Sequence, residues 1–194
     1  MVDRIPDGRT SGRSVAVEPF LEGERARLRP WTLADVAALT AVCQDPEIPR
    51  WTRVPSPYAE HDAHWFVEHF VPLTREAGGA SFCVESREAT SGSEVAGSIA
   101  LLSLADGVGE IGYFLGRPFR GRGLLRDALG TLTRWCFEAR GATRLELHVE
   151  PGNTASRAVA EAAGYVAEGV MREKLPVRGE HRDLVMYARL RRDP

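Results

Sequence analysis

Two stretches of alternating apolar and polar residues flank a stretch of helical periodicity in the second half of the chain. Gly109–Leu115 and Arg144–Val149 alternate with the period of a strand that has two different faces. Between them, apolar residues recur at the spacing of one helix face, at Leu125, Ala128, Leu129, Leu132, Cys136 and Ala139. Gly141 is a typical C-terminal cap for this helix. The pattern predicts a strand, a turn, a long helix and a second strand.

The rest of the chain interleaves strand and helix signals in the same way. Helices are predicted from Thr32, an N-cap with Asp35 at the third helical position, and from Ala59 to Pro72, where the proline should end the helix. The other predicted elements are strands at Ala26–Arg29, Ala80–Arg87, Val95–Ser103, Val166–Met171 and Leu184–Leu190, a hairpin turn at Ser91-Gly92-Ser93, and a short helix at Asn153–Ala163. This interleaving predicts an α/β fold with a mixed sheet covered on both faces.

The turn before the long helix, Arg120-Gly121-Arg122-Gly123-Leu124-Leu125, is the strongest functional signal in the chain. A glycine-rich turn entering a helix presents backbone N–H groups without intrahelical partners, beside the positive end of the helix dipole. Arg117 and Arg126 add further positive charge at its two ends. The turn, called the cradle below, therefore predicts a site for a phosphorylated cofactor.

The glycine spacing argues against two common phosphate-binding motifs. A dinucleotide-binding turn requires G-x-G-x-x-G, whereas Gly121, Gly123 and Asp127 give G-x-G-x-x-x-D. A P-loop requires a Gly-Lys pair, which the sequence does not contain. The pattern that fits is Arg-x-x-Gly-x followed by a small or apolar residue, placed between a strand and a helix.

Four segments extend this pattern over most of the chain. They are Asp45-Pro46-Glu47-Ile48 with Trp51-Thr52, Ile111–Leu115 leading into the cradle, Glu150–Ser156, and Ala163-Gly164-Tyr165. In this order the chain resembles the GNAT acyltransferase superfamily, specifically its Rim-like branch of ribosomal-protein N-acetyltransferases. The resemblance runs from about Ala26 to Leu190. One departure is Leu125, where many members of the superfamily carry Gly or Ala.

The resemblance implies a GNAT fold, in which a mostly antiparallel mixed sheet of about seven strands splays between the fourth and fifth strands. It also implies transfer of an acyl group, with acetyl-CoA as the expected donor, by direct attack of a primary amine and without a metal. The residues implied to bind the cofactor are Phe114, Leu115, Arg120, Gly121, Arg122, Gly123, Leu124, Leu125, Asn153 and Ser156. The strand ending at Phe114 and Leu115 would offer main-chain groups to the pantetheine arm.

Candidates for proton transfer lie on two strands and one helix start. The resemblance nominates Ser156 to protonate the leaving thiolate, although Asn153 and Ser156 in an N-x-x-S arrangement could equally form a helix cap. Glu110 is the first candidate for the general base, His148 the second and Glu150 the third. A solvated strand face explains each of these residues as well.

The acceptor determines how much help from a base is needed. An α-amine with a pKa of about 7.7–8.0 is partly neutral at pH 7, whereas a lysine amine near about 10.4 is almost wholly charged. By the resemblance, the Pro46–Tyr58 segment, called the acceptor loop below, and the Val177–Arg182 turn set specificity. Trp51 and Tyr58 are candidate substrate contacts, and the same aromatic residues could instead belong to the core.

Composition removes other classes of function. The net charge is −2 and no basic stripe is interleaved with aromatic residues, which argues against a nucleic-acid binder. No apolar run approaches the roughly 20 residues of a membrane-spanning helix. Residues 1–22 are predicted to be a disordered or loosely attached leader, and residues 23–192 a single domain.

Cysteine and histidine usage predicts neither disulfides nor a metal site. Cys43, Cys83 and Cys136 lie in apolar settings without a C-x-x-C motif, which predicts buried free thiols and a cytoplasmic location. His61, His64 and His69 lack a third ligand at suitable spacing and are predicted to lie on a solvated helix face. Three alternatives stay open: a succinyl-CoA user, a modifier of antibiotics or other small amines, and a non-catalytic acyl-CoA-binding domain. The acceptor could be a peptide N-terminus or a small molecule, and a homodimer is also left open.

Overall fold

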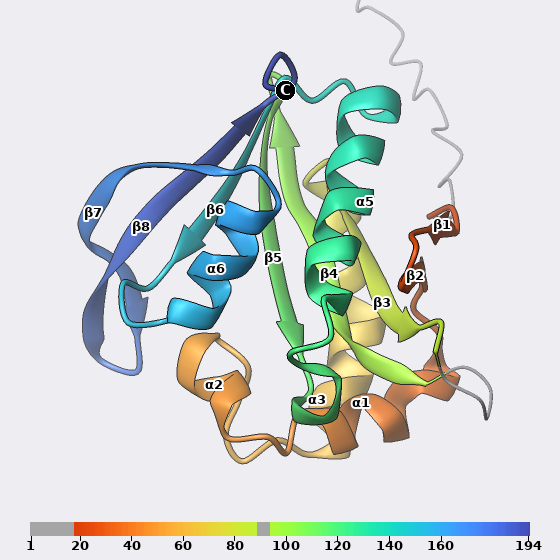
Figure 1. Ribbon diagram of the computed structural model, residues 1–194. Helices are drawn as coiled ribbons and strands as arrows, with labels where there is room; N and C mark the ends of the chain where they lie inside the picture. The colour runs from red at the N-terminus through yellow and green to blue at the C-terminus, as the bar shows by residue number, and fades with distance from the viewer. Residues whose placement is uncertain (1–17, 89–93) are drawn as a thin grey trace, which may run out of the picture.

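The computed structural model describes residues 18–88 and 94–194, and its centre is an eight-stranded sheet in the order β1-β2-β3-β4-β5-β6-β8-β7 (Figure 1). The strands are β1 Leu21–Glu22, β2 Ala26–Pro30, β3 Ala80–Ser86, β4 Val95–Ala105, β5 Val108–Leu115, β6 Arg144–Val149, β7 Val166–Val177 and β8 Glu180–Leu190. The helices are η1 Leu33–Asp35, α1 Val36–Val42, α2 Glu47–Trp51, α3 Glu60–Trp65, η2 Phe66–Phe70, α4 Val71–Glu76, η3 Arg117–Phe119, α5 Leu124–Ala139 and α6 Thr154–Ala162.

The pairing between β5 and β6 opens the sheet. All other neighbouring strands pair antiparallel, whereas β5 and β6 are parallel and pair only from Val108↔Arg144 to Glu110↔Glu146. Beyond that point the two strands diverge, as Figure 1 shows. The predicted splay is confirmed here. The fourth and fifth predicted strands are β5 and β6 in the structure, because the short strand β1 precedes the first predicted strand.

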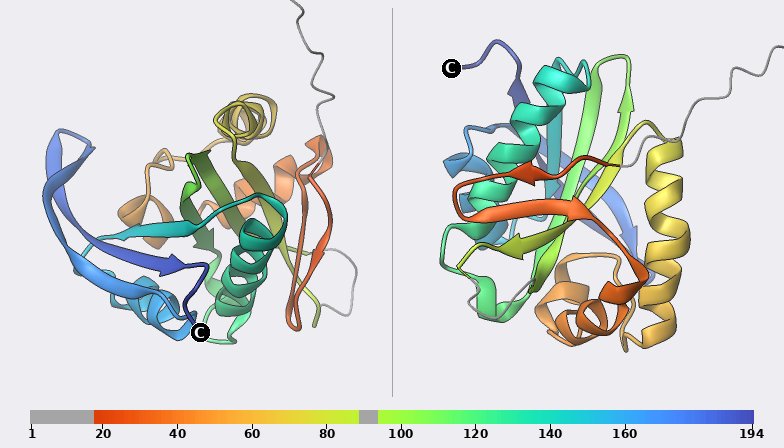
Figure 2. Two further views of the ribbon diagram at one scale, coloured as in Figure 1. Left: turned by 90° about the horizontal axis from the view of Figure 1, so that it is seen from above. Right: turned by 90° about the vertical axis from the view of Figure 1, so that its right-hand side faces the viewer.

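Helices cover both faces of the sheet, with α1 to α4 on one face and α5 and α6 on the other (Figure 2). Each face has its own buried cluster. On the α5 side, Phe82, Ile99, Leu129 and Leu132 are fully buried. On the α1 side, the cluster gathers Trp31, Val36, Leu39, Cys43, Tyr58, Ala63, Val71, Cys83 and Val95. The predicted α/β fold is confirmed. Of the predicted helical stripe, Ala128, Leu129, Leu132 and Cys136 are buried, whereas Leu125 at its start is half-buried and Ala139 at its end is exposed.

The helix predicted to end at Pro72 continues to Glu76, so that boundary is wrong. The helical turns before the proline are π-helical, and the Val71 amide bonds to the Phe66 carbonyl. A π-turn is wider than an α-turn, and this gives room for the ring of Pro72, which also falls in the first turn of α4, where a missing N–H costs little.

Other boundaries also differ from the sequence-based ones. The acceptor loop, predicted to be irregular, contains the short helix α2. Leu21–Glu22, inside the predicted leader, pair with β2 as β1, whereas residues 1–17 lie outside the described part of the chain, as does the predicted turn at Ser91-Gly92-Ser93. The β7–β8 hairpin is longer than predicted at its turn end. No helix among the described residues is long and apolar enough to cross a membrane.

Candidate active site

The cradle has the predicted strand–turn–helix geometry. After β5 and η3, the backbone passes through Gly121 and Gly123 with φ of 75° and 73°, a left-handed conformation that favours glycine. Gly123 is the N-cap of the 16-residue helix α5, so the amides of its first turn have no intrahelical acceptor. A Cβ on Gly121 would meet nothing within 4 Å, which shows that the turn faces open space. Leu124 is buried and Leu125 half-buried, so these residues present backbone rather than side chains.

The arginines of the cradle differ in their surroundings. Arg122 and Arg126 are exposed and form no ion pair within the described part of the chain. The Arg120 guanidinium instead turns back to the protein: its Nε donates to the Leu115 carbonyl at 2.9 Å, and its Nη2 lies 2.7 Å from the Asp45 carboxylate. Exposed positive charge without an ion-pair partner among the described residues is therefore found at Arg122 and Arg126, and at Arg117 before the turn.

The cradle is anchored from behind by a side chain that sequence reasoning did not single out. The Asp127 carboxylate accepts the backbone N–H groups of Glu24, Arg25 and Ala26 at 3.2, 2.9 and 2.9 Å. An aspartate in the first turn of a helix also lies well in the field of the helix dipole. Asp127 therefore fixes the start of α5 against the β1–β2 turn.

The open edge of β5 lies beside the cradle. Phe114 and Leu115, predicted to contact the cofactor, place their side chains in the two opposite core clusters. Their strand is past the last β5–β6 pair, so the side of its backbone that faces β6 has no ladder partner there. Unpaired backbone groups along a strand edge are a natural binding surface for an extended amide-containing ligand. This is the geometry expected for the pantetheine arm.

Ser156 lies on the α5 side of the splay, at the start of α6. Its backbone N–H donates to the Asn153 side chain at 3.1 Å, so the predicted cap is present. Its hydroxyl lies 2.9 Å from the hydroxyl of Tyr113, a β5 residue that the sequence reasoning missed. Burial raises the pKa of Tyr113 to about 12 against the opposing effect of the Ser156 hydrogen bond, so the phenol keeps its proton. The pair can relay a proton into the splay.

Glu110 and His148 meet on the opposite face of the sheet. The parallel pairing of β5 with β6 brings them together, with 3.4 Å between the Glu110 carboxylate and His148 Nδ1. His148 Nε2 lies 3.5 Å from Glu146 and is buried without a hydrogen-bond partner among the described residues. Contact with Glu110 raises the pKa of His148, and contact with His148 lowers the pKa of Glu110. The predicted polar stripe is therefore an interacting pair rather than a row of separate solvated groups.

An ion-pair chain holds this face of β6 in place. Arg144 lies 2.6 Å from Glu146 and 2.5 Å from Glu168 of β7. Glu150, the third base candidate, is bound by Arg182 at 2.8 Å. Glu146, Glu150 and Glu168 are thus each held by an arginine, whereas Glu110 pairs with His148.

The acceptor loop and the Val177–Arg182 turn, predicted to act together, lie in direct contact. Arg178 donates to the carbonyls of Pro49 and Val54 at 2.7 and 3.0 Å. Arg182 donates to the Arg50 carbonyl at 2.9 Å. Trp51 donates to Glu47 at 3.0 Å, and its ring lies near Gly152, just before α6. The loop therefore reaches from the hairpin to the loop that leads into α6.

Tyr58 does not contribute to this surface. Its side chain is 9% exposed and packs in the α1-side core with Trp31 and Leu39. The aromatic residue closes the loop onto the core, and nothing in its sequence context separates this role from substrate contact. Trp51 remains as the aromatic candidate on the acceptor side.

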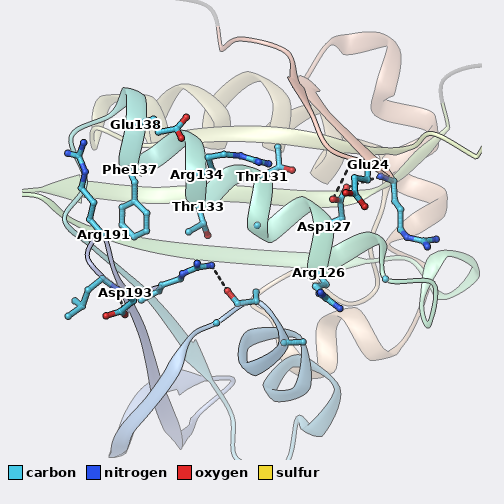
Figure 3. A pocket seen from close by; sticks show the side chains of 18 residues that line it. Glu24, Arg126, Asp127, Thr131, Thr133, Arg134, Phe137, Glu138, Arg191 and Asp193 are labelled. Carbon is cyan, nitrogen blue, oxygen red and sulfur yellow. Dashed lines mark hydrogen bonds between the residues drawn. The ribbon is translucent and has the colours of Figure 1, made fainter.

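A broad groove of about 960 Å³ runs along the outer side of α5, as Figure 3 shows. It touches the cradle only at Gly123 and Arg126, and extends past Phe137 to Arg191 near the end of the chain. The groove is open, and no residue of β5 or β6 lines it, so it is separate from the candidate catalytic side chains at the splay.

The three cysteines are buried free thiols, as predicted. Burial raises the pKa of the Cys43 and Cys136 thiols to about 12 and raises that of Cys83 as well. A thiol with such a pKa is not a nucleophile at neutral pH. No group of three or more His, Cys, Asp or Glu side chains is placed to hold a metal ion in the part of the chain that the structure describes.

Comparison with known proteins agrees with this geometry. The family model described as "Acetyltransferase (GNAT) domain" matches residues 25–166. A Bacillus subtilis protein named "Putative ribosomal N-acetyltransferase YdaF" is 39% identical over 84 residues, which cover 43% of this chain and 46% of that protein. The match thus spans less than half of that relative.

Longer matches cover almost the whole described chain. A Bacillus licheniformis protein named "Uncharacterized N-acetyltransferase p20" is 28% identical over 88% of this chain and 95% of its own length. The solved structure of Mycobacterium smegmatis RimJ in complex with CoA-disulfide superposes with a TM-score of 0.79 at 23% identity, covering 89% of this chain and 87% of that chain. At that identity the likeness shows a shared fold.

Proposed function

The chain belongs to the acetyltransferase (GNAT) family, and from this premise we propose that it transfers an acetyl group from acetyl-CoA to the α-amine of a protein or peptide by direct attack. The family resemblance read from the sequence is confirmed. The observation that carries the proposal is the end of the β5–β6 pairing at Glu110↔Glu146, which leaves the β6-facing backbone edge of β5 without a strand partner as it runs toward the cradle.

The cradle and the open edge of β5 fit the cofactor. The first-turn amides of α5, with Arg122 and Arg126, offer N–H groups and unpaired positive charge to the pyrophosphate. The free backbone groups near Phe114 match the amide groups of the pantetheine arm. Acetyl-CoA supplies an activated thioester. These residues would hold it between the diverging strands β5 and β6, where side chains from both faces of the sheet can reach it.

Proton donors and acceptors then lie on opposite faces of the sheet. On the α5 side, the Ser156 hydroxyl, hydrogen-bonded to Tyr113, donates a proton to the departing thiolate. On the α1 side, neutral His148 removes the proton of the attacking amine. His148 replaces Glu110 as the first choice of base because its raised pKa makes it the stronger acceptor, whereas the lowered pKa of Glu110 makes that carboxylate a weak one. Glu110 then stabilises the imidazolium that forms.

A protein α-amine is supported by two observations. The acceptor loop, with its short helix α2, is held by hydrogen bonds from Arg178 and Arg182 to its backbone carbonyls, which leaves the side chains of the loop available to a peptide. One relative is named as a ribosomal N-acetyltransferase. An α-amine is also partly neutral at pH 7, so a single histidine suffices as its base. We place the enzyme in the cytoplasm, in keeping with its free thiols.

The test is calorimetric titration with acetyl-CoA, succinyl-CoA and free CoA, followed by thiol-release assays with peptides that carry free N-termini. Acetyl-CoA should bind with micromolar affinity, and Arg122→Glu should weaken binding by at least about tenfold because it places negative charge at the phosphate site. Arg134→Glu, at an exposed position on helix α5 that follows this turn, is the matched control and should leave the affinity unchanged. Equal affinities for both variants would refute the cradle, and binding without turnover of any peptide would refute the transfer reaction.

A further inference from the structure

Arg120 occupies the cradle by sequence but faces the acceptor loop in the structure. Its guanidinium joins two points, the Leu115 carbonyl at the end of β5 and the carboxylate of Asp45, at 2.9 and 2.7 Å. The Asp45 side chain is 9% exposed, and its Oδ2 atom, which lies nearest to Arg120, accepts no hydrogen bond among the described residues, so the contact is an ion pair. Arg120 therefore supplies the charge that balances a nearly buried carboxylate.

The same carboxylate begins helix α2. Asp45 Oδ1 accepts the backbone N–H of Glu47 at 3.1 Å, and the Asp45 carbonyl accepts that of Ile48 at 3.0 Å. These amides form the first turn of a five-residue helix, which is too short to be stable by itself. The position of α2 therefore depends on where Asp45 is held, and Arg120 holds it.

The far end of the same segment is held by a separate element. Arg178 and Arg182 of the β7–β8 hairpin bind the carbonyls of Pro49, Arg50 and Val54. The segment Asp45–Val54 is thus fixed at its start by the cofactor side and at its end by the hairpin. Only the first of these links comes from the cradle.

We propose that Arg120 is a positioning residue that couples the cofactor cradle to the acceptor loop, so that acyl-CoA binding fixes helix α2 for the acceptor. The proposal rests on the proposed function, since the coupling is between its two substrates. A ligand on the first-turn amides of α5 restrains the turn that carries Arg120, and the planar guanidinium transmits that restraint to Asp45. Coupling between two sites is reciprocal, so the acceptor should in turn tighten acyl-CoA binding, by the ~5- to 150-fold range usual for such links.

Hydrogen exchange followed by mass spectrometry tests the link without an acceptor. In the wild-type protein, acetyl-CoA should slow exchange of the amides in residues 45–54. In Arg120→Gln, these amides should exchange faster without ligand, and saturating acetyl-CoA should no longer slow them. Asp45→Asn should reproduce both effects, and the double variant should add nothing to either one, because the two residues act as a unit.

Two further variants separate this link from general loosening. Arg122→Gln, in the same turn but with no ion-pair partner among residues 18–88 and 94–194, should weaken acetyl-CoA binding yet keep wild-type exchange at residues 45–54 once the ligand is saturating. Arg178→Gln should speed exchange at residues 45–54 but keep the response to acetyl-CoA. If Arg120→Gln does not fold, Arg120→Lys preserves the charge without the fork and should show a partial loss of the response.

Each outcome decides between the alternatives. Unchanged exchange in Arg120→Gln and Asp45→Asn, or the same behaviour in Arg120→Gln and Arg122→Gln at saturation, would overturn the coupling. Failure of the wild-type protein to bind acetyl-CoA would overturn the proposed function itself and the coupling with it. Binding with no slowing at residues 45–54 would overturn the coupling and leave the proposed function intact.

Discussion

Removing Arg29 should destabilise the protein more than removing any surface arginine. The Arg29 guanidinium binds both oxygens of Asp35 at 2.7 Å and also contacts Glu85, and the side chains of these three residues are only 13, 8 and 6% exposed. Arg29→Met would remove the guanidinium that both buried carboxylates contact. Breaking one buried pair costs about 3–5 kcal/mol, so Arg29→Met should lower the free energy of unfolding by about 4–5 kcal/mol. That is a large fraction of the ~5–15 kcal/mol that holds such a domain folded.

The assay is urea unfolding followed by circular dichroism, and the same strand supplies the control. Arg27 pairs with Glu22 at 2.8 Å, but both side chains are nearly half exposed, so Arg27→Met should cost no more than about 1 kcal/mol. Equal losses of unfolding free energy in the two variants would refute this prediction, because the Arg29 ion pairs are buried and the Arg27 ion pair is exposed.

The pH dependence gives the prediction a second check. In the wild-type protein, burial raises the pKa of Asp35, but hydrogen bonds from Arg29 and Thr32 outweigh it and the net shift is downward. Asp35 therefore adds stability above its unfolded pKa, and this contribution is lost as pH falls through its folded pKa. In Arg29→Met, burial and the hydrogen bonds from Thr32 remain, so protonation of Asp35 at low pH removes the cost of burying its charge. The difference in unfolding free energy between the two proteins should be smaller at about pH 4.5 than at about pH 7.5.

Three further predictions concern the site. Glu110→Gln removes the main cause of the raised His148 pKa, so the rising limb of kcat/KM should move to lower pH; a ~10²- to 10⁴-fold loss of kcat without such a move would instead make Glu110 the base. Gly123→Ala should lower stability by about 1 kcal/mol and weaken acetyl-CoA binding because φ is 73°, whereas Gly130→Ala within α5 should stabilise slightly, as melting and titration will show. The cysteine thiols should react with a thiol reagent only on unfolding, and fast labelling of the native protein would contradict their burial.

Local sequence signals predicted the elements that position the site. Alternation in β5 and β6, the apolar stripe of α5 and the Asn153 cap are all properties of neighbouring residues, and each is found where it was predicted. The Glu110–His148 pair was within reach of the same reasoning, because adjacent parallel strands bring side chains on one face together. The helix past Pro72 was not, since it depends on a π-turn that no local pattern announces.

Contacts between distant segments could not be predicted in the same way. The sequence made Tyr58 a candidate substrate contact and left a place in the core open, and the fold buries it against α1. The Tyr113 hydroxyl was overlooked because alternation puts it on the core face of β5, and its value appears only when α6 brings Ser156 within 2.9 Å. Such roles follow from packing partners, which are set by the whole chain.

The arginines show this limit most clearly. The chain has 24 arginines and a single lysine, a bias that favours planar, forked hydrogen bonding over point charges. Arg120 and Arg122 stand in the same motif and have the same chemistry, and the sequence gives them the same role. The fold separates them, because Asp45 lies beside one and no carboxylate lies within 4.0 Å of the other among the described residues. A motif of this kind therefore predicts a phosphate-binding turn, while the partners that the fold gives each side chain distinguish Arg122, proposed to meet the phosphate, from Arg120, proposed to position the acceptor loop.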